Sequence, residues 1–477
     1  MSDSLWISYE AALATGGQNT CDWEASGLSI DTRTLEQGDM FIAISGSRDG
    51  HDFVAEAFGK GASVALVSHV PKNVPCTKPL LIVKEVSLAL QGLALFRRKQ
   101  FKGKIIAITG SVGKTSSKDM LAIVLSSFGQ VSKAESSFNN HLGVPLTLAR
   151  TPVDNDFLVV EIGMSNKQEI EPLSLLVRPH VALITDVSEA HLASFENVDD
   201  IAKEKSDICC GLRKRGTCIV SSDSQKYTKL LKHLQRFGVK IVSYGQNRTS
   251  NYKLVKTVIK NNKTCAQATL ENGSEFFLKV NSPGVHHAKN ALGIIAVLEV
   301  LGLDTTKGIL GLLNWFPTSG RGRVTNIQCR SNYRARHFTI IDETYNANPS
   351  SVTAALNVLA NFSIKNGAIK NYYRPRRVAI LGDMLELGFS ENSKHAELAS
   401  KLNFDEIDII YCIGSRMKFF YNNVPDSKKG KWVESVKEIS EGITDLVKDQ
   451  DIIMLKASNG MGLNLLLKEL KAMGIPG

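Results

Sequence analysis

The 477 residues are too many for one hydrophobic core, and this length predicts about three domains. Hydrophobic residues make up 43% of the chain and charged residues 22%, which is typical of a soluble globular protein, and no apolar run of about 18 residues or more is present to span a membrane. The net charge of +10 suits an anionic partner, but the chain lacks a basic stripe interleaved with aromatic residues, and a nucleotide-linked small substrate fits this charge as well as nucleic acid does.

The cysteines and the first residues indicate where the chain works. The eight cysteines are scattered without Cys-x-x-Cys spacing, which argues against a zinc site and against a disulfide framework. The opening Met-Ser-Asp-Ser-Leu-Trp lacks the basic start and apolar core of a signal peptide. We therefore expect a cytoplasmic location.

Residues 1–100 are predicted to form a small α/β domain, with strands over 39–44 and 62–68 and a helix over 51–60. Hydroxyl and charged side chains lie beside glycines in two loops, at 29–33 and 45–52. Such loops after strands can hold a polar ligand, although ordinary turn chemistry would explain the same residues. The candidate binding residues are Asp31, Thr32, Arg33, Ser45, Gly46, Asp49, Gly50 and His51.

Residues 101–318 open with the clearest motif of the chain, Ile105-Ile-Ala-Ile-Thr-Gly-Ser-Val-Gly-Lys-Thr-Ser116. The apolar residues predict a buried strand, and the glycine-bearing turn leads into a helix over 114–128. Such a turn points backbone N–H groups at an anion, and the start of the helix adds the positive end of its dipole. The motif therefore predicts a nucleoside-triphosphate site, with an ordinary strand-to-helix turn as the alternative.

Within this loop, Lys114 would reach the terminal phosphates and the Thr115 hydroxyl would bind Mg²⁺. The general phosphate-loop pattern has a further glycine where Ile108 stands, so the loop is a shortened form. The expected ATP-binding residues of the loop are Thr109, Gly110, Ser111, Val112, Gly113, Lys114, Thr115 and Ser116.

The rest of 101–318 alternates short apolar strands with amphipathic helices, which predicts a largely parallel sheet. Residues 245–280 are polar, with alternating polar and apolar side chains, and we expect them to form a small hairpin. The expected strands are 105–108, 157–161, 181–185 and 217–220, and the expected helices are 114–128, 167–176, 198–209 and 286–301.

Three residues of this region are candidate metal ligands or their neighbours. Glu161 ends a strand on the side of the sheet where the phosphate loop lies, so it can share Mg²⁺ with the triphosphate. His191 follows the next strand, and a neutral imidazole there is a plausible second-metal ligand. Lys205 lies in a charged helical segment that, by itself, indicates only a solvated helix face.

Residues 319–477 are predicted to form a second doubly wound domain, after a turn-rich hinge at 315–320. Asp342 and Asn346 follow its first strand and could contact a ribose and a base edge. Arg321 could place its guanidinium on a phosphate when the domains close, with a flexible basic linker as the alternative. The expected strands are 338–341, 377–381, 407–413 and 452–455, and the expected helices are 351–362, 392–402, 433–445 and 463–473.

Taken together, these motifs resemble the Mur ligase superfamily of ATP-dependent amino-acid and peptide ligases over nearly the whole chain. The form Tyr345-Asn-Ala-Asn-Pro349 and the form Gly382-Asp-Met-Leu-Glu-Leu-Gly388 are typical of the branch that adds D-alanyl-D-alanine. The other motifs that carry the resemblance are Asp31-Thr-Arg33, Gly38-Asp-Met-Phe-Ile-Ala43, Asp49-Gly-His-Asp-Phe53, the phosphate loop, Asn139-Asn-His-Leu-Gly-Val-Pro145, Glu161-Ile-Gly-Met164, Ala190-His-Leu192 and Asp342-Glu-Thr344.

The resemblance implies a three-domain α/β fold: a first domain (1–100) for a UDP-sugar, a central ATP- and Mg²⁺-binding domain (101–318), and a Rossmann-like third domain (319–477) that closes on the nucleotide and binds the incoming dipeptide. It implies an ATP-dependent ligase that joins D-Ala-D-Ala to UDP-N-acetylmuramoyl-tripeptide through an acyl phosphate, in peptidoglycan precursor synthesis. The implied partners are these small molecules alone, with no nucleic acid and no membrane insertion, and the chain is expected to be a monomer.

The resemblance also implies roles for single residues. Lys114, Glu161, His191 and Lys205 would be catalytic. Thr115 and Glu161 would hold one Mg²⁺, and His191 would hold a second together with Lys205, whose position in the family carries a CO₂-derived carbamate. Further ATP contacts would come from Asn140, Asn290, Arg321, Asp342 and Asn346.

The chain departs from the family pattern at three places. Lys456-Ala-Ser-Asn459 replaces the usual Lys-Gly-Ser-Arg, Val285-His286-His287 replaces Arg-His-Asn, and Met164-Ser-Asn-Lys-Gln-Glu169 replaces Asn-His-x-Gly-Glu. These changes leave the phosphate and metal ligands in place, so we expect activity to be retained. The alternatives are a superfamily ligase that adds diaminopimelate, lysine or folate-linked glutamate, and a phosphate-loop switch without ligase chemistry.

Overall fold

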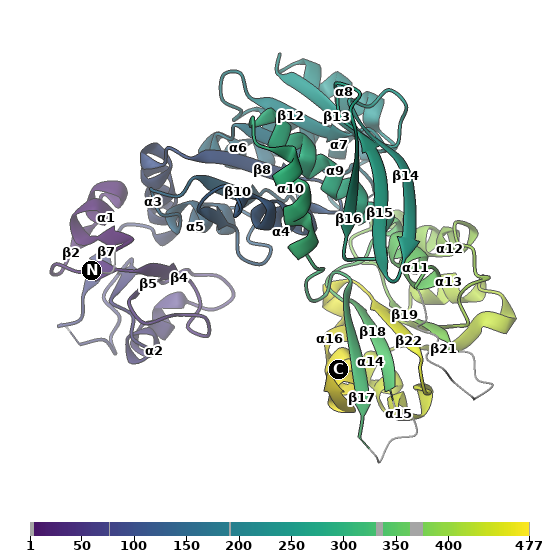
Figure 1. Ribbon diagram of the computed structural model, residues 1–477. Helices are drawn as coiled ribbons and strands as arrows, with labels where there is room; N and C mark the ends of the chain where they lie inside the picture. The colour runs from purple at the N-terminus through teal and green to yellow at the C-terminus, as the bar shows by residue number, and fades with distance from the viewer. Residues whose placement is uncertain (1–3, 76, 190–191, 331–336, 363–374, 477) are drawn as a thin grey trace.

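The computed structural model describes residues 4–75, 77–189, 192–330, 337–362 and 375–476. Within these residues, three large sheets follow one another along the chain, and they run from purple through teal to yellow in Figure 1. Each sheet falls inside one of the ranges predicted for a domain. None of the helices in the described part is both long and apolar enough to cross a membrane. The fold is α/β with mostly parallel sheets.

The first sheet has the strand order β2-β7-β6-β5-β4, with β4 to β7 parallel. Helix α3 closes this region and shares apolar contacts with α5 of the central region, through residues such as Leu90, Leu93 and Leu146. The elements are β1 (Trp6–Ile7), α1 (Ser8–Thr15), β2 (Gln18–Asn19), β3 (Glu24–Ala25), β4 (Gly27–Ser29), β5 (Asp39–Ile42), η1 (Gly50–Phe53), α2 (Val54–Gly59), β6 (Val64–Val67), β7 (Leu80–Ile82) and α3 (Val86–Gln100).

The central sheet has the order β16-β15-β14-β13-β12-β11-β8-β10-β9. From β8 the chain crosses to one side through β9 and β10 and to the other through β11 to β13, so the strand order reverses at β8. Ligands of open parallel sheets bind at the carboxyl ends of the strands beside such a reversal. The strands are β8 (Lys104–Thr109), β9 (Val131–Lys133), β10 (Phe157–Glu161), β11 (Val181–Ile184), β12 (Thr217–Ser221), β13 (Lys240–Gly245), β14 (Tyr252–Lys260), β15 (Lys263–Thr269) and β16 (Glu275–Val280).

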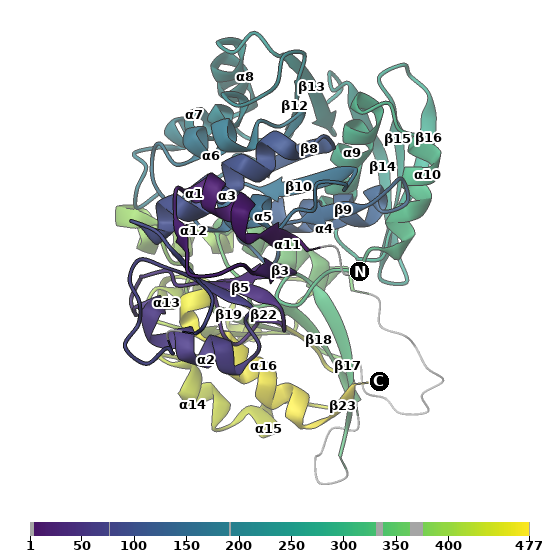
Figure 2. The same cartoon turned by 90° about the vertical axis from the view of Figure 1, so that its left-hand side faces the viewer.

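Helices cover both faces of the central sheet, as Figure 2 shows. Alternate side chains of β8 point to opposite faces: Ile106 and Ile108 pack against α4 and α9, whereas Ile105 and Ala107 pack against α5 to α8. The helices are α4 (Lys114–Leu125), α5 (Gly143–Ala149), α6 (Ile170–Val177), α7 (Val198–Ser206), η2 (Asp207–Cys209), α8 (Tyr227–Gln235), α9 (Val285–Val300), α10 (Thr305–Gly311) and η3 (Leu312–Asn314).

The third sheet has the order β21-β20-β19-β22-β18-β17-β23, with β17 and β23 antiparallel to their neighbours. Its elements are β17 (Arg323–Cys329), β18 (His337–Glu343), α11 (Pro349–Ala360), β19 (Arg377–Gly382), η4 (Gly388–Ser390), α12 (Glu391–Ser400), β20 (Ile409–Ile413), α13 (Met417–Asn422), η5 (Asp426–Lys428), β21 (Lys429–Val433), α14 (Val436–Ser440), α15 (Ile443–Leu446), β22 (Ile452–Lys456), η6 (Asn459–Met461), α16 (Leu463–Ala472) and β23 (Gly474–Pro476).

Two predicted elements are wrong in form. The helix expected over 433–445 is split into α14 and α15, because Val433 still belongs to β21, Ser435 and Glu438 form a capping box that starts α14, and Gly442 interrupts the helical run. The excursion over 245–280 is not a separate hairpin. Its strands β14, β15 and β16 extend the central sheet, because β14 pairs with β13.

Candidate active site

The phosphate loop has the backbone of an anion-binding turn. It joins β8 to α4, with Gly113 at a φ of 85° and Gly110 at a φ of 153°. A Cβ on Gly110 would lie 2.1 Å from the Thr185 Oγ1 atom, so a larger residue does not fit there. Lys114 Nζ donates to the Gly110 carbonyl oxygen at 2.6 Å, so the lysine lies folded over the loop. Burial lowers the pKa of Lys114, and the nearby Glu161 carboxylate opposes this shift.

Thr115 and Glu161 meet beneath the loop, as the sequence predicts. The register of β10 against β8 places Glu161 opposite Ile108, one residue before the loop begins. The Thr115 hydroxyl donates to one Glu161 carboxylate oxygen at 2.8 Å, and Asn139 Nδ2 donates to the other at 2.8 Å. Both residues are buried. A hydroxyl and a carboxylate beside a phosphate site are the oxygen ligands that Mg²⁺ uses together with a triphosphate, so this donor set fits Mg²⁺.

Lys205 is not on a solvated helix face, the interpretation that its local sequence favours. It lies on α7 with a side chain only 1% exposed, near Lys114 and Asp186. Burial first, and then the positive charge of Lys114, lower its pKa well below the usual value. The folded protein therefore favours the neutral amine more than water does, and the neutral amine is the form that can react with CO₂. His191, the other candidate ligand of the second metal ion, lies outside the described residues.

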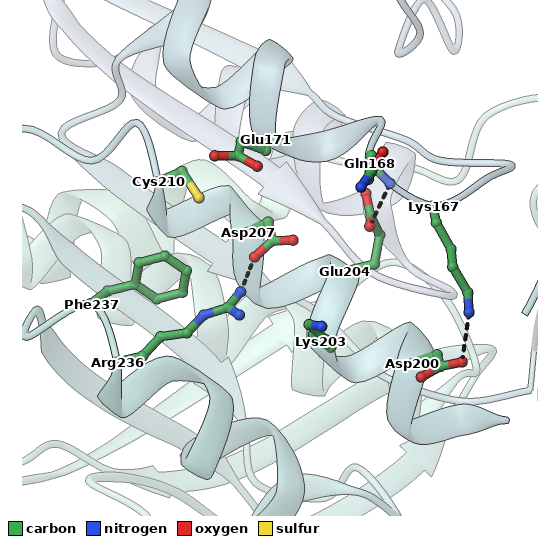
Figure 3. Close-up of a pocket in the computed structure, with 10 residues that line it drawn as sticks. All are labelled: Lys167, Gln168, Glu171, Asp200, Lys203, Glu204, Asp207, Cys210, Arg236 and Phe237. Carbon is green, nitrogen blue, oxygen red and sulfur yellow. Dashed lines mark hydrogen bonds and ion pairs between the residues drawn. The ribbon is translucent and has the colours of Figure 1, made fainter.

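Ion pairs and hydrogen bonds fix α7 from its outer side, as Figure 3 shows. The Glu204 carboxylate accepts hydrogen bonds from the backbone N–H groups of Gln168, Glu169 and Ile170, at 2.8, 3.0 and 3.0 Å. These N–H groups lead into α6, which begins at Ile170, three residues later than predicted. An ion pair also joins Asp207 to Arg236. Residues of this side of α7 line the pocket drawn in Figure 3. The neighbouring Lys205 is not among the residues that line it, and it is buried.

The third region reaches the phosphate loop through its hinge. Arg321 Nη2 donates to Ser137 Oγ at 3.0 Å, and this hydroxyl oxygen lies 3.4 Å from Thr115 Oγ1. Asp342 serves the hinge itself: its oxygens accept from Ser319 and from the Gly320 N–H at 2.9 and 2.8 Å, and from Thr344. The predicted contact of Asp342 with the nucleotide stays a prediction.

Asn346 and Lys456 lie together in the third region. Asn346 is exposed, and its side chain oxygen accepts from the Ala347 N–H at 2.8 Å. Lys456 Nζ donates to the Asn346 carbonyl oxygen at 3.0 Å and to Glu343 at 3.2 Å. The lysine of the Lys-Ala-Ser-Asn departure therefore supports the loop that carries Asn346.

Asn290 and Asn140, the remaining predicted ATP contacts, have different surroundings. The Asn290 amide packs on the phosphate loop, since a Cβ on Gly113 would lie 3.1 Å from its side chain oxygen. The Asn140 oxygen accepts from the N–H groups of Leu142 and Gly143 at the start of α5, at 3.2 and 2.9 Å. Asn290 is thus beside the loop, and Asn140 holds the turn that leads into α5.

His286, which matches the family pattern, and His287, which departs from it, pack at the hinge. His286 and His287 lie with ring centroids 4.0 Å apart, and His287 Nδ1 is 2.7 Å from Ser282 Oγ. Burial first, and then the charge of Lys456, lower the pKa of His286 to about 4. Both rings are therefore neutral at physiological pH and fill space between the central and third regions.

The first-region candidates form a second polar site. The loops at 31–33 and 45–51 follow β4 and β5, which are adjacent and parallel, so both open at the same edge of the sheet. Asp31 accepts from the Arg33 guanidinium, which lowers the pKa of Asp31 to about 2. Thr32 is buried, and its carbonyl oxygen accepts from Lys60 Nζ at 2.9 Å.

In the second loop, Asp49 accepts from Ser45 Oγ at 2.9 Å and from His51 Nδ1 at 2.7 Å, and the His51 bond first of all lowers the pKa of Asp49 to about 2. Gly46 has open space around its Cα. A Cβ on Gly50 would lie 2.5 Å from the Ile44 carbonyl oxygen, so this glycine allows the loop to fold back on the strand end.

Sequence reasoning missed three residues of the centre, Ser137, Asn139 and Tyr345, as separate site residues. Asn139 and Ser137 sit in the polar loop after β9, and Tyr345 precedes Asn346. The available signal was a run of hydroxyl and amide side chains, Ser136-Ser-Phe-Asn-Asn140, between two strands of the sheet that carries the phosphate loop.

Comparison with known proteins agrees with this geometry. Three family models match: Mur ligase family, catalytic domain, at 24–98; Mur ligase middle domain, at 108–298; and Mur ligase, glutamate ligase domain, at 327–459. The UDP-N-acetylmuramoyl-tripeptide–D-alanyl-D-alanine ligase of Rickettsia prowazekii is 31% identical over 96% of this chain and 98% of its own length. The enzyme of that name from Bacillus subtilis is 30% identical over 93% of each chain.

Solved structures are similar over the same extent. The crystal structure of MurF from Acinetobacter baumannii superposes with a TM-score of 0.81, at 27% identity, over 98% of this chain and 99% of that one. Sequence and structure agree from the first sheet to the third, and the chain belongs to the Mur ligase family.

Proposed function

We propose that this Mur ligase is an ATP-dependent enzyme that joins D-alanyl-D-alanine to UDP-N-acetylmuramoyl-tripeptide, giving the UDP-linked pentapeptide, ADP and phosphate. The observation that carries the ligase chemistry is the group at the phosphate loop, where the buried Thr115 and Glu161 lie with the partly buried Lys114 and with the buried Lys205 beside them. The choice of substrates is supported by relatives that are named for this reaction and that are similar to this chain over almost their whole length.

The mechanism follows from the poor reactivity of a carboxylate as an acyl donor. The terminal carboxylate of the tripeptide attacks the γ-phosphorus of ATP, the bond to ADP breaks, and an acyl phosphate forms. The amine of D-Ala-D-Ala then attacks the acyl carbon, loses a proton, and expels phosphate through a tetrahedral intermediate. Such phosphoryl transfer depends on positioning and charge neutralisation, so no nucleophile from the protein is needed.

The residues of the site would divide this work. Lys114 and the N–H groups of the loop would hold the β- and γ-phosphates, and Arg321 would add a guanidinium from the hinge. Thr115 and Glu161 would hold Mg²⁺, and Lys205, as its carbamate, would hold a second ion together with His191. Bound Mg²⁺ would supply neutralisation of the negative charge on the transferring phosphoryl group.

The two other domains would bring the remaining substrates. The first domain's loops at 31–33 and 45–51 would bind the UDP-sugar, since they offer hydroxyls, N–H groups and an exposed guanidinium at one sheet edge. The third domain would bring the dipeptide and would close on the nucleotide with Asn346.

We further propose that the protein is a monomer. We also propose that it is cytoplasmic, because ATP and a UDP-linked precursor are cytoplasmic substrates and its cysteines lack a disulfide pattern.

The test is phosphate release with Mg²⁺-ATP, the UDP-linked tripeptide and D-Ala-D-Ala, with each component omitted in turn. We expect release to need both peptide substrates, and a pentapeptide product of matching mass. Release with the UDP substrate but another amine, such as diaminopimelate or lysine, would keep the family and change the reaction. Release that needs neither peptide substrate would favour a phosphate-loop switch and would overturn the proposal.

A further inference from the structure

Arg321 stands at the joint between the central and third domains. It follows Gly320 in the hinge and precedes β17, and its side chain is partly buried. One side of its guanidinium faces the central domain, where Nη2 donates to Ser137 Oγ at 3.0 Å. The other contact comes from the third domain, where the guanidinium carbon lies 3.8 Å from the centre of the Tyr345 ring. The arginine is therefore held between two domains by two different side chains.

The backbone fixes the ring beside the arginine. The Tyr345 N–H donates to the Gly320 carbonyl oxygen at 3.1 Å, and Gly320 has a φ of 76°. A Cβ on Gly320 would lie 2.9 Å from the Tyr345 Cβ, so the glycine permits this approach. Asp342 accepts from the Gly320 N–H at 2.8 Å, which ties the same turn to the end of β18. The position of the ring is thus set by the hinge itself.

The other contact leads directly to the phosphate loop. The Ser137 hydroxyl oxygen is 3.4 Å from Thr115 Oγ1, and the Thr115 hydroxyl donates to Glu161 at 2.8 Å. The loop of Ser137 is itself anchored, because the buried Lys118 Nζ donates to the carbonyl oxygen of Ser136. A continuous chain of contacts therefore runs from the third-domain ring, through the arginine, to the residues proposed to hold Mg²⁺.

We propose that Tyr345 and Ser137 are positioning residues that clamp the Arg321 guanidinium, so that closure of the third domain delivers an oriented cation to the phosphates of ATP. The inference rests on the proposed function, in which Arg321 contacts the nucleotide, and adds the residues that set the conformation of Arg321. A free arginine side chain has many rotamers, and ordering it on binding weakens affinity. A ring below the guanidinium and a hydroxyl at its edge remove part of this loss, because the flat cation stacks on an aromatic face.

The proposed clamp requires particular side chains at positions 345 and 321. The stacking partner must be flat and aromatic, so phenylalanine can replace Tyr345, whereas leucine cannot. The clamped cation must be planar, so lysine at position 321 keeps the charge and loses the effect. If Tyr345 were needed only for folding, these variants would not differ specifically in their affinity for ATP.

The experiment measures kcat and KM for each substrate, together with calorimetric titration of Mg²⁺-ATP without either peptide substrate. We expect Tyr345→Leu and Ser137→Ala to weaken ATP binding by about 5- to 30-fold, the size of one cation–π or charge-assisted contact. The loss should show both in the KM for ATP and in the directly measured affinity. Tyr345→Phe should stay within about twofold of the parent protein. KM for the UDP substrate should be unchanged in all three variants. In the Arg321→Lys background, Tyr345→Leu should add no further loss.

Phe237→Leu provides the matched control, because it removes another ring stacked under an arginine, Arg236, away from the phosphate loop. It should leave the ATP affinity unchanged. The proposal would be overturned by full ATP affinity in Tyr345→Leu, by an equal defect in Tyr345→Phe, or by additive losses with Arg321→Lys. Because the titration needs neither peptide substrate, it tests the clamp even if the proposed ligase reaction itself fails its own test.

Discussion

At the residue scale, burial determines the chemistry available to the cluster beneath the phosphate loop. Burial lowers the pKa of both Lys114 and Lys205, and the positive charge of Lys114 lowers the pKa of Lys205 further. For Lys205 the shift favours the neutral amine, whose lone pair can attack CO₂, more than in an exposed lysine. A carbamate would turn this position from a cation into a carboxylate-like ligand, which explains how a lysine can serve a metal site.

Replacing Lys205 by alanine should lower ligase activity by about 100-fold or more, because a lost ligand of a catalytic metal usually costs at least as much as a lost outer contact. Short carboxylates such as acetate or propionate should restore part of the activity by taking the place of the carbamate. Lys203→Ala, on the exposed side of the same helix, is the control and should remain active. Activity in Lys205→Ala without added carboxylate, or a defect that no carboxylate relieves, would contradict the metal role. The readout is phosphate release.

At the element scale, the pairing of β8 and β11 fixes the base of the phosphate loop. His180, just before β11, donates its backbone N–H to the Ile105 carbonyl oxygen at 2.8 Å, and its Nδ1 accepts from the Ile105 N–H at 2.9 Å. Burial first, and then the charges of Arg213 and its neighbours, lower the pKa of His180 to about 4. The neutral ring is thus the form that the folded protein stabilises.

The sign of the pH dependence follows from this shift. The folded-state pKa lies below the unfolded value, so the contribution of His180 is fully present above about pH 6.5 and is lost as the pH falls towards 4. Between pH 7.5 and pH 5 the loss should be about 1–2 kcal/mol, after allowance for partial solvent exposure.

We therefore expect the parent protein to lose more thermal stability over this pH range than His180→Gln, whose amide oxygen can still accept from Ile105 and does not titrate. Melting curves at both pH values measure the difference. His337→Gln, at a largely exposed histidine of the third domain, should keep the pH dependence of the parent. Equal pH dependence in the parent and in His180→Gln would show that the histidine is not the titrating group.

At the scale of the whole molecule, the third domain touches the central domain at a second place besides the hinge. Lys394 of α12 pairs with Glu189 of the loop after β11, at 2.7 Å, and both side chains are partly buried. Burial works against the charge of Lys394, but the bond to Glu189 raises its pKa. Beside this pair, the Ala193 N–H donates to the Glu386 carbonyl oxygen at 3.3 Å, and Gly388 packs on the same loop. Two separate contacts therefore hold this arrangement of the domains.

Reversing one charge of this pair should weaken that arrangement. We expect Lys394→Glu to lower kcat/KM by about 3- to 10-fold, because it places two carboxylates together where about 1 kcal/mol of attraction is lost. The double variant Glu189→Lys with Lys394→Glu should recover most of the loss. Lys401→Glu, on the exposed side of the same domain, serves as the control. Losses that simply add in the double variant would show that the pair is not a coupled contact. The measurement is a double-mutant cycle on kcat/KM at low and high salt.

Local sequence determined most of the elements and the phosphate site. The apolar run Ile105 to Ile108 predicts a buried strand, and the glycines, lysine and threonine that follow it are typical of an anion-binding turn. The prediction failed where neighbours in sequence compete, as at 433–445, where a capping box and a glycine divide one apparent helix into two. The proposed amine substrate was suggested by whole motifs such as Tyr345-Asn-Ala-Asn-Pro349, because spacing and composition do not encode which amine is added.

Only the tertiary structure decided the environment of the charged residues. The segment around Lys205 has the charge pattern of an exposed helix, yet packing of α7 against the sheet buries that lysine. One Asp342 oxygen accepts from the hinge residues Ser319 and Gly320, and the other accepts from Thr344. Tyr345 meets Arg321 because Gly320 lets the turn fold back. Burial, pKa and contacts between domains depend on residues that are far apart in the chain. For that reason local sequence was enough to predict the phosphate loop and most strands and helices, whereas only the folded arrangement showed which charged side chains act together.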